Sequence, residues 1–257
     1  MPWTFAHPAA VVPLKRWAPR YLGFPALVCG SFTPDFGYYF NPYRFADDAH
    51  TFAGSFVICI PVGLCLLLLF LLFREPLWFL LPQPHRGAIA PLAAKPVKYS
   101  LRALAVAAIS VLIGAWTHIL WDSFTHAGTW FHGAVPSART PLFVIGSTPI
   151  YLRTFLQHGS TLLGIVVMVT AYRRWLHKQP ELQPRAEQDR WRYLLIGGAA
   201  VVSASTAATL AWDEEYLRVF KTVVDSTCLF AAILFVYCLI YYLVNYSRRK
   251  VTTSTSR

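Results

Sequence analysis

Long apolar runs separated by short polar or basic segments dominate the sequence. A helix of about 20 apolar residues crosses the hydrocarbon core of a bilayer, which is about 30 Å thick. Five runs approach or reach this length, and the third is the shortest. The pattern therefore predicts five membrane-spanning helices, at Ala53–Phe73, Leu101–Leu120, Ser160–Trp175, Trp191–Trp212 and Ser226–Tyr246.

A sixth apolar stretch, Tyr21–Phe40, is interrupted by Pro34 and Asp35. Proline removes a backbone donor and disfavours helix in the residue before it, so we expect a bend here that leaves Asp35 in a turn. Met1–Arg20 predicts a cap with Thr4 as the N-cap, followed by an amphipathic helix too short to span. Together these segments predict a broken or re-entrant helix pair at the N-terminus.

The predicted fold is therefore an all-α, polytopic membrane protein. Its composition agrees, since 56% of the residues are hydrophobic and only 14% are charged, and its mean hydropathy is +0.44. We expect residues 1–175 to form a membrane-embedded domain and residues 176–257 to form a C-terminal pair of membrane helices.

The formal net charge of +11 would suggest nucleic acid in a soluble protein, but here the basic residues flank apolar runs. With five spans, 15 lysines and arginines lie on the side that holds the C-terminus and 8 lie on the other. The positive-inside rule places the richer side in the cytoplasm. We therefore expect a multi-pass protein of the inner membrane with a cytoplasmic C-terminus, whose partner is the lipid bilayer and not nucleic acid.

One alternative topology stays open. If Tyr21–Phe40 also spans, the counts become 18 and 5, and His7 moves to the opposite face from the other candidate residues. Between the spans, Arg74–Ser100 predicts a proline-rich cytoplasmic loop, and Thr129–Thr154 predicts a loop long enough to act as a lid. The carboxylates of Asp213–Glu215 predict a solvated cap.

The second span ends in a stripe of ionisable residues. His118, Asp122 and His126 lie at i, i+4 and i+8, so on a helix their side chains leave nearly the same face. Such residues are rare on a membrane helix unless they face a partner, an ion or water. Eight residues of helix rise roughly 12 Å, which is too far for both histidines to bind one ion. The spacing predicts either two ions or a helix break before His126.

Further histidines fall on the same membrane face in the five-span topology. His7, His50, His132 and His158 join Asp35 there, and His158 is an additional ligand or supporting donor in this interpretation. Structural alternatives exist, because interfacial and capping histidines are common and Thr-Pro-Asp is ordinary helix-start chemistry. The candidate metal ligands are His7, Asp35, His50, His118, Asp122 and His126.

Histidine and aspartate are nitrogen and oxygen ligands suited to Zn, Mn or Fe. A bound divalent ion lowers the pKa of water toward about 7 and so permits hydrolysis of a phosphoryl or acyl group. We expect one or two ions, with zinc the first choice, and catalytic roles for Asp122 and His118. Two alternatives need no hydrolysis: an ion- or proton-handling transporter, or a haem carrier that uses two facing histidines. Polar packing without a ligand is the third.

Four motifs carry a resemblance to known families: Pro2-x-Thr4-Phe5-x-His7-Pro8-Ala9-Ala10, Gly30-Ser31-x-x-Pro34-Asp35-Phe36, His50-Thr51 at the start of a span, and Gly114-x-x-x-His118-x-x-x-Asp122-x-x-x-His126. Through about Gly164 the chain resembles a bacterial membrane family of unknown function. More distantly, it is similar to inner-membrane proteins assigned as metal-dependent hydrolases, and through these to all-helical zinc-dependent phospholipase C enzymes. The distant resemblance implies a metal site and a lipid or phosphoester substrate. Where those hydrolases have His-Arg-Gly-x-x-His, this chain has only Ala49-His50-Thr51.

Overall fold

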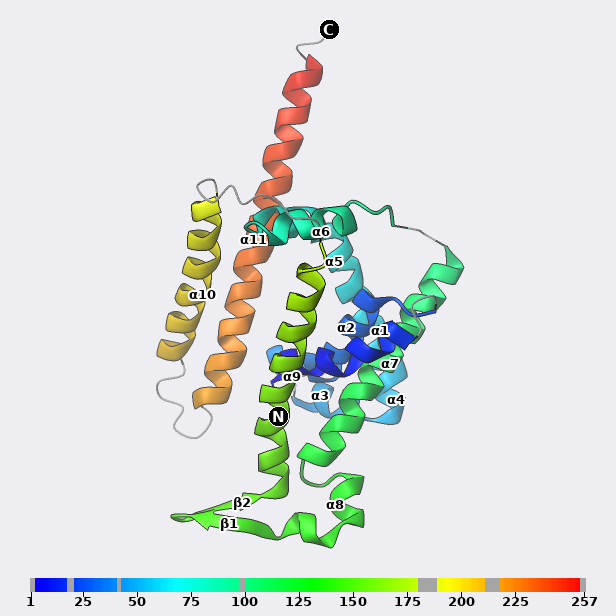
Figure 1. Ribbon diagram of the computed structural model, residues 1–257, viewed down its shortest axis with the longest axis vertical. Helices are drawn as coiled ribbons and strands as arrows, with labels where there is room; N and C mark the ends of the chain where they lie inside the picture. The colour runs from blue at the N-terminus through cyan, green and yellow to red at the C-terminus, as the bar shows by residue number, and fades with distance from the viewer. Residues whose placement is uncertain are drawn as a thin grey trace. The chain divides into compact units, whose positions relative to one another are not determined.

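The computed structural model describes residues 3–17, 21–40, 43–97, 100–179, 189–210 and 218–254 (Figure 1). Within these ranges, five helices are long and apolar enough to cross a membrane. Each overlaps one predicted span, so the all-α, polytopic fold is confirmed. The spans are Phe52–Leu80, Leu101–Thr125, Leu152–Leu176, Arg190–Leu210 and Val219–Asn245.

The chain divides into two compact units. The first consists of Met1–Leu69 and Lys98–His177, and the second of Phe70–Val97 and Lys178–Arg257. All the candidate metal ligands belong to the first unit, so its internal packing decides where they lie.

The N-terminal region of the first unit is a series of short helices. They are η1 (Thr4–Val11), α1 (Val12–Trp17), α2 (Phe24–Phe32), η2 (Pro34–Tyr39) and α3 (Tyr43–Ala49). The predicted break at Pro34 is confirmed, because α2 ends before it and η2 starts on it. With nine and six residues, α2 and η2 are each too short to span a bilayer.

The next elements form the first span: α4 (Phe52–Gly54), a π-helical turn η3 (Ser55–Cys59) and α5 (Ile60–Leu80). Thr51 is the N-cap, and its Oγ1 accepts a hydrogen bond of 2.9 Å from the amide of Gly54. This cap fixes where the span starts and therefore where His50, one residue earlier, is held.

The second span, α7 (Leu101–Thr125), crosses α2 at very close range. Two glycines make this possible. A Cβ on Gly30 would overlap the backbone carbonyl of Val111, and a Cβ on Gly114 would overlap the carbonyl of Leu27. Leu27 and Val111 are themselves fully buried at this crossing. The contact fixes α2, and with it the start of the turn that carries Asp35, against the helix that carries His118.

The prediction of a loop over Thr129–Thr154, after α7, was wrong, because most of this segment is regular secondary structure. It contains α8 (Trp130–Ala134), η4 (Pro136–Arg139) and an antiparallel hairpin of β1 (Pro141–Ile145) and β2 (Thr148–Tyr151) that leads into α9 (Leu152–Leu176) (Figure 1). Phe143 lies opposite Ile150 and Val144 opposite Pro149. Gly146, at φ 60°, supplies the left-handed turn that closes the hairpin.

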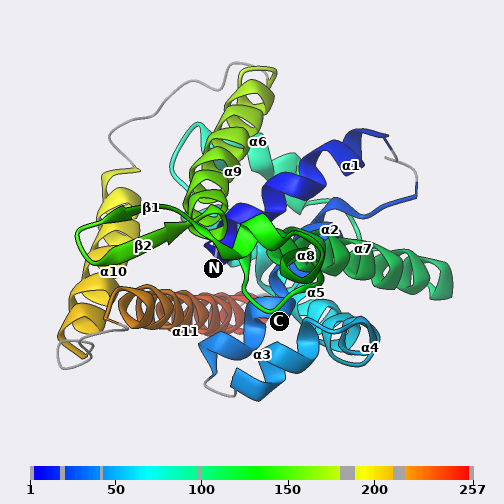
Figure 2. The ribbon, with the colours of Figure 1, turned by 90° about the horizontal axis from the view of Figure 1, so that it is seen from below.

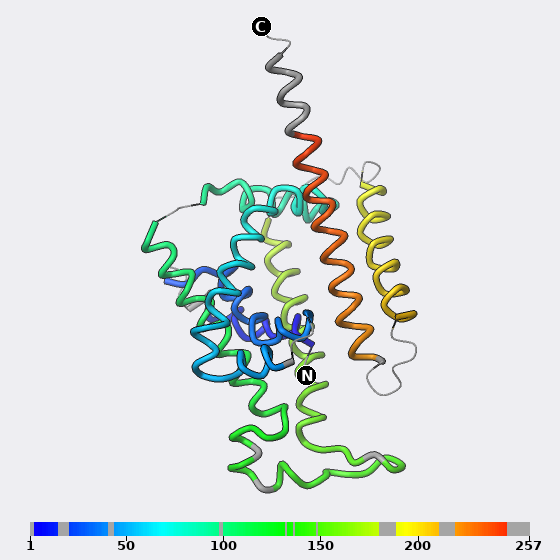
Figure 3. The backbone as a smooth tube through the Cα atoms, turned by 180° about the vertical axis from the view of Figure 1, so that it is seen from behind, coloured from blue at the N-terminus to red at the C-terminus, as the bar shows by residue number. Residues whose placement is uncertain are grey.

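The second unit contains α6 (His85–Ala93), α10 (Arg190–Leu210) and α11 (Arg218–Ser254). Helices α10 and α11 lie side by side (Figure 3). The prediction of a loop over Arg74–Ser100 was wrong in part, because α5 continues to Leu80 and α6 follows. The Asp213–Glu215 cluster lies outside the described residues.

Asp189 connects three segments of the second unit. Its Oδ2 accepts a 2.7 Å hydrogen bond from the amide of Gln83, and its Oδ1 accepts a 2.6 Å bond from Nη1 of Arg192. Nη2 of Arg86 lies 3.4 Å from the same Oδ1. The Gln83 amide, followed by the two guanidinium charges, holds the pKa of Asp189 below its usual range.

We expect Asp189→Asn to lower the melting temperature of the detergent-solubilised protein by roughly 5 °C at neutral pH, because the buried Arg192 loses its carboxylate partner. The folded pKa of Asp189 is depressed, so its stabilisation is complete above its unfolded pKa, near 3.8, and is lost as the pH falls through the folded pKa. The difference between variant and wild type should therefore shrink below about pH 4. Asp47→Asn, on the exposed side of α3, is the matched control, and a difference independent of pH would contradict the assignment.

Candidate metal centre

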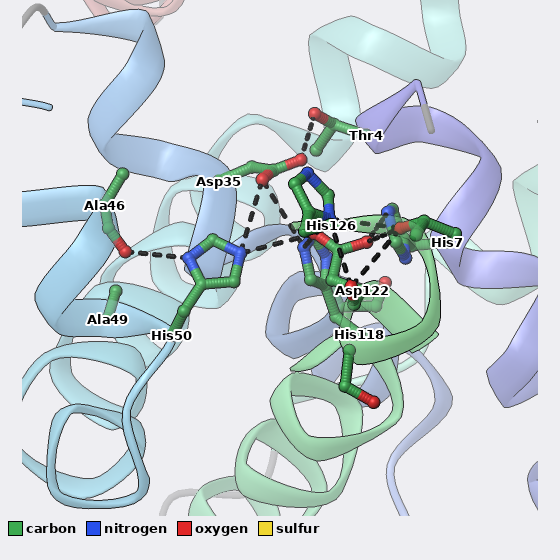
Figure 4. A network of polar contacts seen from close by, with 12 residues as sticks. Thr4, His7, Asp35, Ala46, Ala49, His50, His118, Asp122 and His126 are labelled. Carbon is green, nitrogen blue, oxygen red and sulfur yellow. Dashed lines mark hydrogen bonds and ion pairs between the residues drawn. The ribbon is translucent and has the colours of Figure 1, made fainter. Parts of the chain in front are cut away.

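Four side chains from three segments of the first unit converge on one point (Figure 4). Asp35 comes from η2, His50 from the turn after α3, and His118 and Asp122 from α7. One ligand atom from each lies within 4.8 Å of all the others. The five-span topology predicted that these residues share one membrane face, and the α2–α7 crossing and the Thr51 cap bring them together.

The distances between the facing atoms suit a metal better than hydrogen bonds. Nε2 of His118 lies 3.3 Å from Oδ2 of Asp122 and 3.4 Å from Oδ1 of Asp35. Nε2 of His50 lies 3.5 and 3.7 Å from the same two oxygens. Charge-assisted hydrogen bonds are about 2.7–2.9 Å long. Ligands about 2.0–2.1 Å from a tetrahedral zinc ion stand about 3.3–3.4 Å apart, which is close to the observed spacing.

The two imidazoles are held in one orientation by backbone carbonyls. Nδ1 of His50 lies 2.7 Å from the carbonyl oxygen of Ala46, and Nδ1 of His118 lies 2.8 Å from that of Ser31. A carbonyl only accepts hydrogen bonds, so Nδ1 carries the proton in both rings. In the neutral ring, Nε2 then presents its lone pair to the carboxylates, which is the usual arrangement of a metal-binding histidine.

Three of the four facing atoms are buried and make no hydrogen bond within the part of the chain that the structure describes. Asp35 and His118 are fully buried and Asp122 is 4% exposed. Among the described residues, Oδ1 of Asp35, Nε2 of His118 and Oδ2 of Asp122 are buried atoms with no hydrogen-bond partner. Two carboxylates this close, out of water, repel each other and lose hydration. A divalent cation at their common point would satisfy the orphaned atoms and offset the charge.

Thr4 supports the centre in a way that the sequence did not reveal. Its Oγ1 donates a 2.6 Å hydrogen bond to Oδ2 of Asp35, so the other oxygen of that carboxylate faces the cluster. The prediction of Thr4 as an N-cap was wrong, since Trp3 is the N-cap of η1 and makes no capping bond with its side chain. In the sequence, only the spacing of Thr4 and His7, which places them on one face of a helical turn, could have indicated that Thr4 lies at the centre.

His7 lies beside the four-residue cluster. Its ring stacks on that of His118, with centroids 3.6 Å apart and 16° between the planes. Its Nε2 lies 3.6 Å from Oδ1 of Asp122, the oxygen that does not face the cluster. Burial, followed by the neighbouring His118, lowers the pKa of His7 to about 3, so its ring is neutral at neutral pH. Because His7 and Asp122 are this close, they lie on the same side of the membrane, and the topology that separates them is excluded.

His126 lies at the edge of the centre. Helix α7 ends at Thr125 and His126 has extended backbone, so the predicted helix break before His126 is present. Its Nδ1 lies 3.1 Å from the carbonyl oxygen of Asp122 and 3.6 Å from Oδ2 of the same residue. The side chain is 32% exposed, the most open of the histidines that contact Asp122.

Two further histidines, His132 and His158, were predicted on the same membrane face as the centre. His158, on α9, is exposed and does not belong to the four-residue cluster. The side chain of His132 is not among those that the structure describes. The centre therefore has four converging residues, Asp35, His50, His118 and Asp122. His7 and His126 both lie against the carboxylate of Asp122.

Comparisons with known proteins place the chain in a family but give it no activity. Neither a curated protein nor a solved structure matched the chain. One family matched, described as a domain of unknown function (DUF4184), over residues 1–247. This range includes all five spans and all six candidate ligands. The chain therefore belongs to the DUF4184 family.

Proposed function

We propose that this protein is a membrane-bound, metal-dependent hydrolase whose ion is held by Asp35, His50, His118 and Asp122. The observation that carries the proposal is the geometry of the four facing atoms. Three of them are buried without a hydrogen-bond partner in the described ranges, and each histidine–carboxylate pair is spaced at 3.3–3.7 Å. A purely structural polar cluster would instead be expected to close into hydrogen bonds of ordinary length.

The donor set favours zinc. Zinc readily binds imidazole nitrogen and carboxylate oxygen, and this centre offers two of each. The buried thiol of Cys59 has another partner, since its Sγ donates to the carbonyl oxygen of Ala49 at 3.4 Å. Divalent metal bound in this centre would polarise a substrate oxygen and lower the pKa of water toward about 7. Asp122 would be the ligand that fixes the position of the metal, because it contacts every histidine of the centre.

A basic pocket beside the centre supports a phosphoester as the substrate. A cavity of about 330 Å³ begins one residue after His126 and includes two arginines but no carboxylate in its lining. The guanidinium carbon of Arg153 lies 4.0 Å from the ring centre of Tyr151, which holds one of these cations in the pocket. Arginine suits phosphate through paired, charge-assisted hydrogen bonds. The lining is Ala127, Gly128, Thr129, Gly133, Arg139, Tyr151 and Arg153.

The hairpin of β1 and β2, which contributes Tyr151 to the pocket, supports a lipid as the substrate. Four consecutive residues of β1, Leu142–Ile145, are apolar and more than half exposed. The hairpin leads directly into α9, a candidate span, so its place in the chain is at the end of a membrane helix. Apolar side chains there would be covered by the acyl region of the bilayer. An amphiphile with an anionic phosphate head would then reach the pocket from the membrane.

Charge distribution supports the proposed location in the inner membrane, with the C-terminus in the cytoplasm and the centre on the extracytoplasmic side. His50 precedes the start of the first span, and Asp122 lies near the end of the second. These two ends share one side of a membrane that both helices cross. The opposite ends carry the larger share of lysine and arginine in the sequence.

The test is hydrolysis by purified full-length protein in detergent micelles, with long-chain phosphatidic acid and a soluble aryl phosphate as the two probes. We expect phosphate release that a chelator abolishes and zinc restores, because the activated water depends on the ion. Faster release from the lipid than from the aryl phosphate is expected if the hairpin presents membrane substrate.

Two outcomes would count against this function. Phosphate release that survives both chelation and Asp122→Asn would place the activity outside the centre. Stoichiometric zinc binding without hydrolysis of either probe would contradict the enzyme and favour the ion-handling alternative.

A further inference from the structure

We propose that a second divalent ion binds between Nε2 of His7 and Oδ1 of Asp122, so that Asp122 bridges two ions. This ion, and not the one held by four residues, would have the open coordination positions that hydrolysis needs. The inference rests on the proposed function, because it assigns the water-binding role within the same centre.

The four-residue cluster has no evident room for a substrate. Four protein ligands fill a tetrahedral shell, and zinc sites of this kind are closed, whereas catalytic sites keep one position for water or substrate. The side chains of Asp35, His118 and Asp122 are each at most 5% exposed. An ion at this point would mainly fix the geometry of its ligands, so a reacting water needs another position.

His7 offers such a position on the other side of Asp122. Its side chain is only 2% exposed, and its Nε2 has no hydrogen-bond partner among the described residues. That nitrogen lies 3.6 Å from Oδ1 of Asp122, within the 3.3–3.7 Å range of the histidine–carboxylate spacings in the first cluster. The other contact of Oδ1 is weak, since Oγ1 of Thr125 is 3.5 Å away. A bridging carboxylate holds two ions about 3.5–4 Å apart in known hydrolytic centres.

The segment that carries His7 is held firmly in place. Helix η1 packs against α9 (Figure 2). The backbone amide of Trp3 donates a 3.1 Å hydrogen bond to Oγ1 of Thr161, and a Cβ on Gly164 would lie 2.8 Å from the carbonyl oxygen of Ala6. This close fit positions His7 from outside the cluster, independently of the contacts of α7.

A partly exposed histidine borders the carboxylate of Asp122. Nδ1 of His126 lies 3.6 Å from Oδ2 of Asp122, and the side chain of His126 is 32% exposed. The basic pocket starts at the next residue, Ala127. A second ion with two fixed protein ligands, His7 and Asp122, would therefore keep several positions for water and for a phosphate oxygen from the pocket.

Metal stoichiometry tests the inference directly. Full-length protein is equilibrated with excess Zn²⁺, freed of unbound metal, and analysed for metal per chain. We expect two ions in wild type and one in His7→Ala and His7→Gln, with the affinity of the remaining ion changed less than about 3-fold. His158→Ala, an exposed histidine of α9, should retain two. Retention of the first ion shows that the His7 variants are folded.

A second readout uses Mn²⁺ in place of zinc. Two ions bridged by one carboxylate give an exchange-coupled paramagnetic signal in wild type, whereas His7→Ala should give the signal of an isolated ion. One ion in wild type, and the same one ion in His7→Ala, would overturn the second site. Chelator-sensitive phosphate release by that one-ion protein would leave the proposed function standing, with the water on the first ion. Wild type that binds no ion under these conditions would overturn both.

Discussion

Asp122→Asn is expected to abolish metal binding and hydrolysis together. Oδ2 of Asp122 faces His118 and His50, while Oδ1 faces His7. Asparagine keeps the shape but removes the charge and replaces one acceptor oxygen by an amide that donates. Even outer contacts of a metal site cost about 10–100-fold in affinity, so loss of a shared ligand should weaken binding by at least about 100-fold.

The measurement is metal content after equilibration at a zinc concentration that saturates wild type. Thermal unfolding gives a second readout. An ion present at about 1,000 times its dissociation constant stabilises the folded state by about 4 kcal/mol, so wild type should gain stability on addition of zinc and the variant should not. Asp47→Asn, an exposed aspartate on α3, should behave as wild type. Equal zinc content in Asp122→Asn and wild type would contradict the assigned centre.

Gly114→Ala is expected to have the second large effect, although Gly114 is no ligand. The added methyl group would overlap the carbonyl of Leu27 and come within 3.1 Å of the carbonyl carbon of Gly30. Both obstacles are backbone, which cannot rotate away. Helices α2 and α7 must therefore separate or shift, at a cost of about 3 kcal/mol in unfolding free energy.

The same shift should reach the metal centre. The carbonyl of Ser31, at the end of α2, holds Nδ1 of His118, and Asp35 follows α2 by three residues. We expect the melting temperature to fall by about 5–10 °C and zinc affinity to fall with it. The melting temperature is measured by thermal unfolding and the zinc affinity by metal titration, both on the detergent-solubilised protein.

Gly197→Ala is the control for this substitution. Gly197 lies within α10, and a Cβ there meets no atom within 4 Å. Alanine is the better helix former by about 1 kcal/mol, so this variant should be as stable as wild type or slightly more stable. Similar losses in Gly114→Ala and Gly197→Ala would show that the helix crossing is not the cause.

The sequence predicted the spans and the helix break well, because both depend on local chemistry. An apolar run needs a membrane or a core whatever its neighbours are, and Pro34 bends the chain wherever α2 packs. The hairpin at β1 and β2 was missed because its proline-containing strands and its turn at Gly146 also fit an irregular loop. Helix α6 was missed for a similar reason, since Pro91 lies inside it.

The candidate residues could be named from the sequence, but their partners could not. The spacing of His118 and Asp122 implied a shared face, whereas the meeting of Asp35 with His50 depends on the path of the chain between them. The role of Thr4 depends on a contact 31 residues away. Such contacts follow from packing over long sequence separations, which local patterns do not encode.

The two carbonyls that orient His50 and His118 have a consequence for how this family can vary. Both supports are backbone atoms, of Ala46 and Ser31, so their side chains contribute no atom to either bond. Substitution at these positions can leave the imidazoles aligned as long as the helix path is unchanged. Divergent members can therefore keep the same inner arrangement with different residues around it, and a search for shared supporting side chains would not detect these two supports.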